Sequence, residues 1–163
     1  MRELRAGMVW IVDYCGKLWK LDVATETFTQ VANVAPMSQW YITSLAMDSS
    51  ERYLYYCPGA HGTACNEGTP IFQYDLKTGH IKAICYLSPS TLTKGTGYIC
   101  NGIFSLALSE DDPTLFVTWN GFRPVFPELT WVGEGAIGGG EGAHYSDVCA
   151  VSAIRIPVGE RMP

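Results

Sequence analysis

Two histidines lie in glycine-rich stretches of the sequence, His61 in "CPGAHGTAC" and His144 at the end of "VGEGAIGGGEGAH". Glu141 and Asp147 lie close to His144 in sequence. A histidine oriented by a carboxylate can act as a general base, which lyase and hydrolase chemistry requires. Glycine-rich loops also hold histidines for hydrogen bonding alone. These four residues are therefore the catalytic candidates, with a loop-stabilising role as the alternative.

The same stretch contains Gly133, Gly135 and Gly138 at the G-x-G-x-x-G spacing of dinucleotide-binding loops. That motif needs a helix after it, and the glycine-rich continuation is unfavourable for a helix at about 1 kcal/mol per interior glycine. Glu134 and Glu141 would also repel a pyrophosphate. The sequence therefore favours a mobile lid or a partner-binding loop over a nucleotide site.

A second cluster, in "CPGAHGTAC", places Cys57, His61 and Cys65 four positions apart. A zinc site would need further ligands, such as His144 or Cys149, and this spacing is not one of the usual zinc patterns. A local Cys57–Cys65 disulfide or two plain thiols is the simpler interpretation. We expect no metal at this cluster.

The composition describes one globular domain over residues 1–163, with 47% hydrophobic residues and a formal net charge of -5. Nucleic-acid binding depends largely on Lys and Arg contacts to phosphates, so this charge argues against it. No apolar run approaches the roughly 20 residues that a membrane helix needs, and we find no signal peptide. Cellular location stays open, and a periplasmic or extracellular one would suit a fragment of a longer precursor.

Apolar residues alternate with polar ones between turn signals, and no stretch has convincing helical spacing, which predicts an all-β fold. The expected strands are Met8 to Asp13, Lys17 to Leu21, Thr27 to Val31, Ile42 to Ala46, Tyr53 to Tyr56, Pro70 to Asp75, Ile81 to Tyr86, Gly102 to Leu108, Leu115 to Thr118 and Ala150 to Ile156.

Two kinds of segment repeat along the chain. "KLWKLDVATETFTQV" aligns with "PIFQYDLKTGHIKAI", and "TSLAMDSSERYLYYCPG" aligns with "FSLALSEDDPTLFVTWNG". Together they describe a four-stranded antiparallel unit with strands a, b, c and d. These hairpins resemble the blades of β-propellers of the lactonase, streptogramin-lyase and YVTN-repeat groups. The resemblance covers nearly the whole chain apart from the loops, and it implies a propeller fold without fixing a function.

In that interpretation the chain is a partial β-propeller of about two and a half blades, against four to eight in closed propellers. Strands b to d of the first blade occupy residues 8–33, the second blade 42–86, and strands a to c of the third 102–157. A glycine-rich b–c insertion covers 120–148. We expect the missing blades to come from another chain, from self-association, or from sequence lost upstream.

The long b–c and d–a connections all open on one face of a propeller, which makes that face the candidate for function. Trp40, Tyr41, Trp119 and Trp131 lie in or beside these connections. Exposed aromatic rings suit sugar stacking or a protein interface. The alternative for Trp119, which ends a strand, is packing between blades.

The resemblance to lactonase-type propellers further implies a calcium ion near the propeller axis. Asn101, Asn120 and Asp147 lie at suitable strand ends. Asn101 and Asn120 are also candidates for contacting a small ligand. No other cofactor is implied.

The leading functional prediction is a protein- or ligand-binding propeller module completed by a partner protein or by copies of itself, with a small molecule or sugar as a further candidate ligand. The alternative is a lactonase-like lyase or hydrolase whose active site lies on the long-loop face.

Overall fold

The computed structural model describes residues 7–36, 41–58, 69–87, 103–109, 114–121 and 148–161, five of them by backbone alone. Within these ranges the chain forms ten strands. They are β1 (Met8–Val12), β2 (Lys17–Asp22), β3 (Thr27–Asn33), β4 (Leu45–Met47), β5 (Tyr53–Tyr56), β6 (Ile71–Asp75), β7 (Ile81–Cys85), β8 (Ile103–Leu108), β9 (Thr114–Gly121) and β10 (Val148–Arg155). Each strand overlaps the range expected from the sequence, so the all-β prediction is confirmed.

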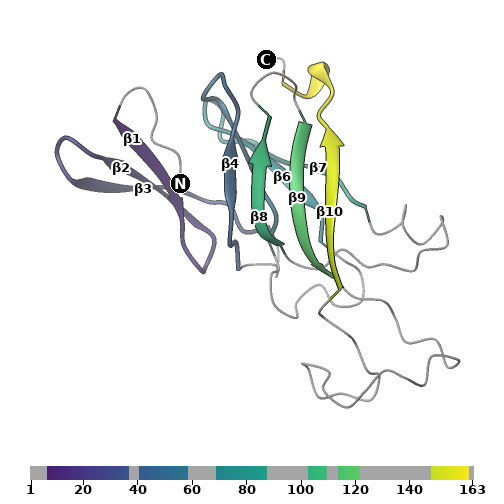
Figure 1. Cartoon of the computed structure of the whole chain (residues 1–163). Coiled ribbons are helices and arrows are strands. Elements are labelled where there is room, and N and C mark those ends of the chain that lie inside the picture. The colour runs from purple at the N-terminus through teal and green to yellow at the C-terminus, as the bar shows by residue number, and fades with distance from the viewer. Residues whose placement is uncertain are drawn as a thin grey trace, which may run out of the picture.

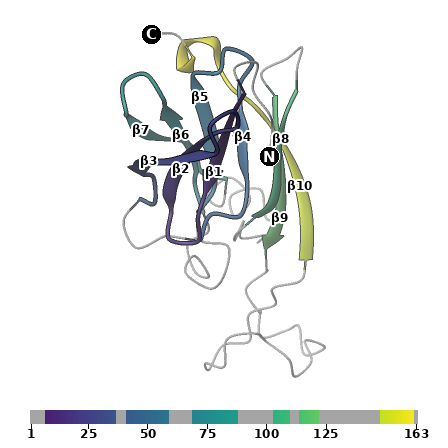
Figure 2. The same ribbon diagram turned by 90° about the vertical axis from the view of Figure 1, so that its left-hand side faces the viewer.

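The described strands form three antiparallel sheets, and within each sheet every strand pairs with its neighbours in sequence. The first sheet is β1-β2-β3, the middle sheet is β4-β5-β6-β7 and the third sheet is β8-β9-β10. Figure 1 shows β4 of the middle sheet between the first and third sheets, and in Figure 2 the first sheet overlaps the middle sheet while the third sheet lies to the right. Chain order and spatial order therefore agree.

Short polar turns join the strands, and aspartate side chains close them. Asp22 accepts hydrogen bonds from the backbone N–H groups of Ala24 and Thr25 at 3.0 and 3.1 Å. Asp48 similarly accepts from the backbone N–H groups of Arg52 and Tyr53 at 3.1 and 2.9 Å. Such bonds offer a local alternative to the strand ladder, which is why the strands end at these residues.

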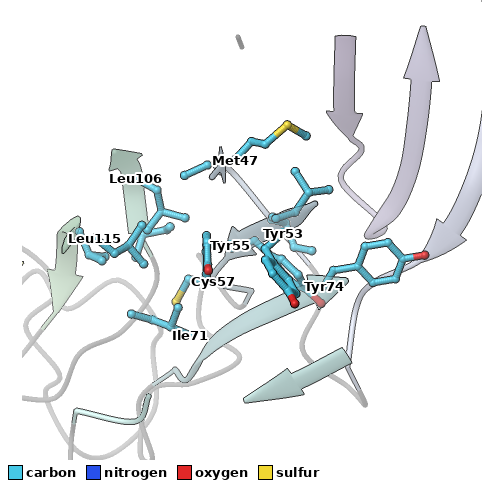
Figure 3. Packing of buried hydrophobic residues seen from close by; sticks show 14 of the residues in the cluster. Met47, Tyr53, Tyr55, Cys57, Ile71, Tyr74, Leu106 and Leu115 are labelled. Carbon is cyan, nitrogen blue, oxygen red and sulfur yellow. The ribbon is translucent and has the colours of Figure 1, made fainter. Parts of the chain in front are cut away.

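The core lies on both sides of the middle sheet. All four residues of β5 are buried, so both faces of this strand are covered. From the third sheet, Leu106 and Leu115 approach Tyr55 and Ile71 (Figure 3). From the first sheet, the buried Leu18 joins the same cluster.

The middle and third sheets meet along their first strands. The hydroxyl of Thr43 donates to the carbonyl of Ile103, and the hydroxyl of Ser44 accepts from the N–H of Leu106 at 2.9 Å. Neighbouring meander sheets whose first strands lie together are the arrangement of a β-propeller. The fold is therefore all-β, a partial β-propeller of three antiparallel sheets within the described residues.

One predicted strand is shorter and later than expected. The sequence places a strand from Ile42 to Ala46, whereas β4 covers Leu45–Met47. The side chains of Thr43 and Ser44 bond the third sheet instead, as described above. These contacts join residues some 60 positions apart, so local periodicity could not have revealed them.

After β10 the chain turns onto the middle sheet. Ile156 is buried, and a 3-10 turn, η1 (Val158–Glu160), follows Pro157. The side-chain amide of Gln73 donates to the carbonyl of Glu160 at 2.9 Å, and Lys82 pairs with the Glu160 carboxylate. In the part of the chain that is described, no helix is long and apolar enough to cross a membrane.

Candidate interaction surfaces

The predicted catalytic residues His61, Glu141, His144 and Asp147 lie outside the described residues, and so do Trp40, Cys65, Asn101 and Trp131. The general-base hypothesis therefore stays a prediction. So do the calcium ligands, because Asp147 and Asn101 are among these residues and Asn120 is described by its backbone in β9 alone. Among the described residues, no group of three metal-ligating side chains is present.

Tyr41 is the predicted ligand-contacting residue that the structure does place. Its ring lies edge-on to that of Tyr14, with the centroids 4.4 Å apart, and its backbone N–H donates to the Tyr14 carbonyl at 3.1 Å. Tyr41 has φ +66°, an unfavourable conformation for a bulky residue. Tyr14 is 61% exposed. The sequence did not single out Tyr14, although it lies in the turn between β1 and β2, on the expected long-loop face.

Trp119 belongs to the core and not to the long-loop face. Its side chain is 1% exposed, and its indole N–H donates to the hydroxyl of Ser152 at 2.9 Å. Interpreting Trp119 as a ligand-stacking residue was wrong, and the alternative, packing between sheets, is confirmed. The signal was available in the sequence, because Leu115, Val117 and Trp119 alternate along one face of the strand.

Cys57 follows directly after β5 and is fully buried in the core (Figure 3). Its predicted disulfide partner, Cys65, is outside the described residues, so the pairing stays a prediction. Cys85 lies in β7 and is partly buried, and this burial raises the pKa of its thiol.

Two tyrosines of β5, Tyr55 and Tyr56, have phenol groups whose pKa is raised by burial. Burial raises the pKa of Tyr55 to about 12, although a hydrogen bond from Gln73 opposes the shift. Burial raises the pKa of Tyr56 further still. These phenols are therefore packing groups of the core, and they are unsuited to proton transfer near neutral pH.

The third sheet has one covered face and one exposed face. Leu115 and Val117 on β9 are 0% exposed and point into the core, whereas Phe116 between them is 45% exposed. Val151 on β10 is 71% exposed. We call this exposed side the third-sheet outer face; its residues are Ser105, Ala107, Phe116, Thr118, Val151 and Ala153.

The strand register joins these residues into one surface. Ala107, Phe116 and Ala153 lie opposite one another across the three strands, and Ser105, Thr118 and Val151 form the next row. Residues in register on one face of a sheet have neighbouring Cβ atoms. The six residues of the third-sheet outer face therefore form a continuous and mainly apolar surface without a charged residue.

The first sheet has a similar face on the side away from the core. Trp10, Val12 and Ala32 pack toward the core cluster. The alternate residues of the three strands point the other way. They form the first-sheet outer face, which consists of Val9, Ile11, Trp19, Leu21, Phe28 and Gln30. Val9 is buried at one edge of this face, the residues of β2 are partly buried, and the residues of β3 are exposed. Phe28 is 58% exposed at its edge.

A hydrogen bond fixes the position of the largest side chain on this face. The indole N–H of Trp19 donates to the carboxylate of Asp13 at 3.1 Å, and the backbone N–H groups of Cys15 and Lys17 donate to the same carboxylate. Desolvation opposes ionisation of Asp13, but these hydrogen bonds outweigh it and hold the pKa of the carboxyl below its ordinary value. The Trp19 ring is thus held by an ionised partner.

Comparisons with known proteins give little beyond the fold. No protein-family model matches the chain, and no curated protein matches it in sequence. A solved structure similar to the chain is the β-propeller domain of Cps50 (Swd1) from Myceliophteria thermophila, at 10% sequence identity and a TM-score of 0.42. The match covers 92% of this chain and 36% of that one, so the chain spans about a third of the length of the propeller domain it matches.

Proposed function

We propose that the chain is a protein-binding β-propeller module whose end sheets dock further blades through their outer faces. The observation that carries this proposal is the alternation along β9 and β10. On one side of the third sheet, Leu115 and Val117 of β9 are fully buried and the residues of β10 are partly buried, while Phe116 and Val151 on the other side are 45% and 71% exposed. Large apolar side chains gathered on one exposed face mark an interaction site.

The middle sheet indicates what kind of partner such a face accepts. Its strand β5 is buried on both sides, with the first sheet facing one side and the third sheet facing the other. Packed sheets interdigitate the side chains of their facing surfaces. Both outer faces consist mainly of apolar side chains without a charged residue, so another β-sheet is the partner that their chemistry fits.

Burying the exposed side chains of these two faces would contribute a substantial free energy to association. Removing an exposed Phe or Val side chain from water contributes about 1.5–3 kcal/mol when burial is complete. Phe28, Phe116 and Val151 together would therefore contribute several kcal/mol, before the costs of association.

Binding is preferred here to catalysis. The lyase or hydrolase prediction depends on residues outside the described ranges, and no described side chain favours it. The predicted sugar or small-molecule ligand likewise has the Tyr14–Tyr41 pair as its described support.

Hydroxyl-radical footprinting of the protein in its native cell extract and in purified form tests the proposal. We expect Phe28 and Phe116 to be protected from oxidation in the assembled state and labelled when the assembly is dissociated. Tyr14, which is exposed but lies on neither outer face, is the matched control and should be labelled in both states. Equal labelling of both phenylalanines in every state would rule the proposal out.

A further inference from the structure

We propose that the partner is a second copy of this chain, and that two copies close into a ring of six sheets. In this ring the first-sheet outer face of each copy packs on the third-sheet outer face of the other. The inference rests on the proposed function, because it names the occupant of the two outer faces.

The number of sheets favours two copies. Each chain contributes three sheets within its described residues, so two chains contribute six. Closed propellers contain four to eight blades. A contact between two different faces generates a ring when the rotation closes, and a twofold rotation closes after two copies. The resulting dimer needs no further partner to cover its faces.

The sizes of the side chains on the two faces are complementary. The first-sheet outer face presents large groups, Trp19 and Leu21 on its central strand and Phe28 on its edge strand. On the third-sheet outer face, Phe116 lies between Ala107 and Ala153 in one row across the strands. Two small residues beside one large residue leave room for large side chains of a facing sheet, which is how packed sheets interdigitate.

Pairing between identical faces would leave apolar surface exposed. If two third-sheet outer faces packed together, Phe116 and Val151 would be covered, but Phe28 of both copies would stay in water. The ring covers all four outer faces with two equivalent interfaces. Because stabilisation grows with the apolar area removed from water, the ring is the favoured arrangement.

Light scattering coupled to size exclusion tests this geometry with two single variants, Phe28→Lys and Phe116→Glu. Each variant alone places a charge in both interfaces of its own dimer, so we expect each to weaken dimerisation by about 100-fold or more. A mixture of the two variants should form a 1:1 dimer. In that mixed dimer one interface is unaltered and the other pairs Lys with Glu.

Controls separate assembly from folding. Val23→Lys and Val158→Glu alter residues that are 45% and 63% exposed but lie on neither outer face, and both variants should remain dimeric. Circular dichroism should show unchanged β structure in all four proteins. If either phenylalanine variant fails to fold, Gln30→Lys and Ala153→Glu, at exposed positions on the same two faces, replace them.

Three results would overturn the ring. The first is a wild-type protein that stays monomeric up to its solubility limit. The second is loss of the dimer with Phe116→Glu but not with Phe28→Lys, which indicates pairing of identical faces. The third is a mixture of variants that stays monomeric. If the wild type is monomeric while footprinting still shows both phenylalanines protected in the extract, the ring is wrong and the proposed function stands.

Discussion

The middle sheet and the third sheet differ in how many of their faces are covered. In β5 four consecutive residues are buried, whereas in β9 the residues Leu115, Val117 and Trp119 are buried and Phe116 between them is not. Among the described strands, those of the middle sheet have a neighbouring sheet on each side, and those of the third sheet have one. The pattern of burial along a strand therefore indicates whether its sheet is covered on one face or on both.

The apolar content of the two strands differs much less than their burial. Both faces of β5 carry apolar or aromatic residues, namely Tyr53, Leu54 and Tyr55. The outer face of β9 likewise carries an aromatic residue, Phe116. A sheet adapted to solvent on one face alternates cleanly between apolar and polar residues. The third sheet does so only in part, and its sequence is closer to that of a sheet with two neighbours.

The largest expected effect comes from Trp119, compared with Phe116 on the opposite face of β9. Trp119→Ala should lower the free energy of unfolding by about 3–5 kcal/mol, because it empties a fully buried site and leaves the Ser152 hydroxyl without its partner. Phe116→Ala should change the stability of the isolated monomer by less than about 1 kcal/mol. Urea denaturation under conditions that keep the chain monomeric measures both.

Leu54→Ala and Tyr55→Ala extend this test to the middle sheet. These neighbours also point to opposite faces, but both are buried, so both substitutions should be costly. A large loss from Phe116→Ala in the monomer would contradict the comparison, because it would mean that the third-sheet outer face is already covered within one chain.

A smaller effect is expected from two glycines that have positive φ in two different turns. Gly16 precedes β2 and Gly79 lies between β6 and β7, with φ +77° and +73°. Either Gly→Ala substitution costs about 1–2 kcal/mol from the left-handed backbone. At Gly16 the added Cβ would also lie 2.3 Å from the Cβ of Ala35, whereas at Gly79 the nearest atom, the Tyr74 hydroxyl, is 3.8 Å away.

Thermal unfolding of the two variants should therefore show a clearly larger loss for Gly16→Ala than for Gly79→Ala. Asp13 and Val34 hold the Gly16 turn through backbone hydrogen bonds of 3.0 and 2.8 Å, so the turn cannot move away without breaking them. Equal losses at the two positions would show that the chain around Ala35 adjusts freely, and that the first sheet is less tightly joined to its connection than the structure indicates.

The strands could be predicted from the sequence because their determinants are local. Alternating apolar residues and Asp- or Gly-containing turns lie within a few positions of each strand, as in "KLWKLDVATETFTQV". The bounds of β4 were predicted less well. Thr43 and Ser44 form hydrogen bonds with the third sheet, to residues that are distant in sequence. Local patterns cannot report such contacts.

The candidate surfaces were harder to find. Histidines and glycines in the loops are typical of functional sites, whereas the alternating apolar residues of the strands indicate a core. Phe116 and Val151 were missed because an exposed apolar residue and a buried one look alike in sequence. A strand with apolar residues on both faces is expected to have a neighbouring sheet on each side. Such a strand indicates an uncovered face only when the structure shows that its sheet has a single neighbour.

The smallest expected effect concerns the ion pair that ties two turns of the middle sheet together. The guanidinium of Arg52 donates two hydrogen bonds to the carboxylate of Asp75, at 3.0 and 2.7 Å. This pairing holds the pKa of Asp75 well below its ordinary value. The repeat-equivalent Asp22 of the first sheet accepts backbone hydrogen bonds in its turn from Ala24 and Thr25. The two aspartates should therefore respond differently to the loss of charge.

Because the folded-state pKa of Asp75 is depressed, its contribution to stability is complete above the unfolded value of about 3.9 and is lost as the pH falls below it. Arg52→Gln brings the folded pKa back toward the unfolded one. The stability difference between wild type and Arg52→Gln should thus be largest near neutral pH and should shrink below about pH 4. Urea denaturation between pH 3 and 7 measures it, with Asp22→Asn as the control that leaves the ion pair intact. A difference independent of pH would mean that Arg52 stabilises the turn through its packing over the Tyr53 ring, 4.9 Å away, and not through Asp75.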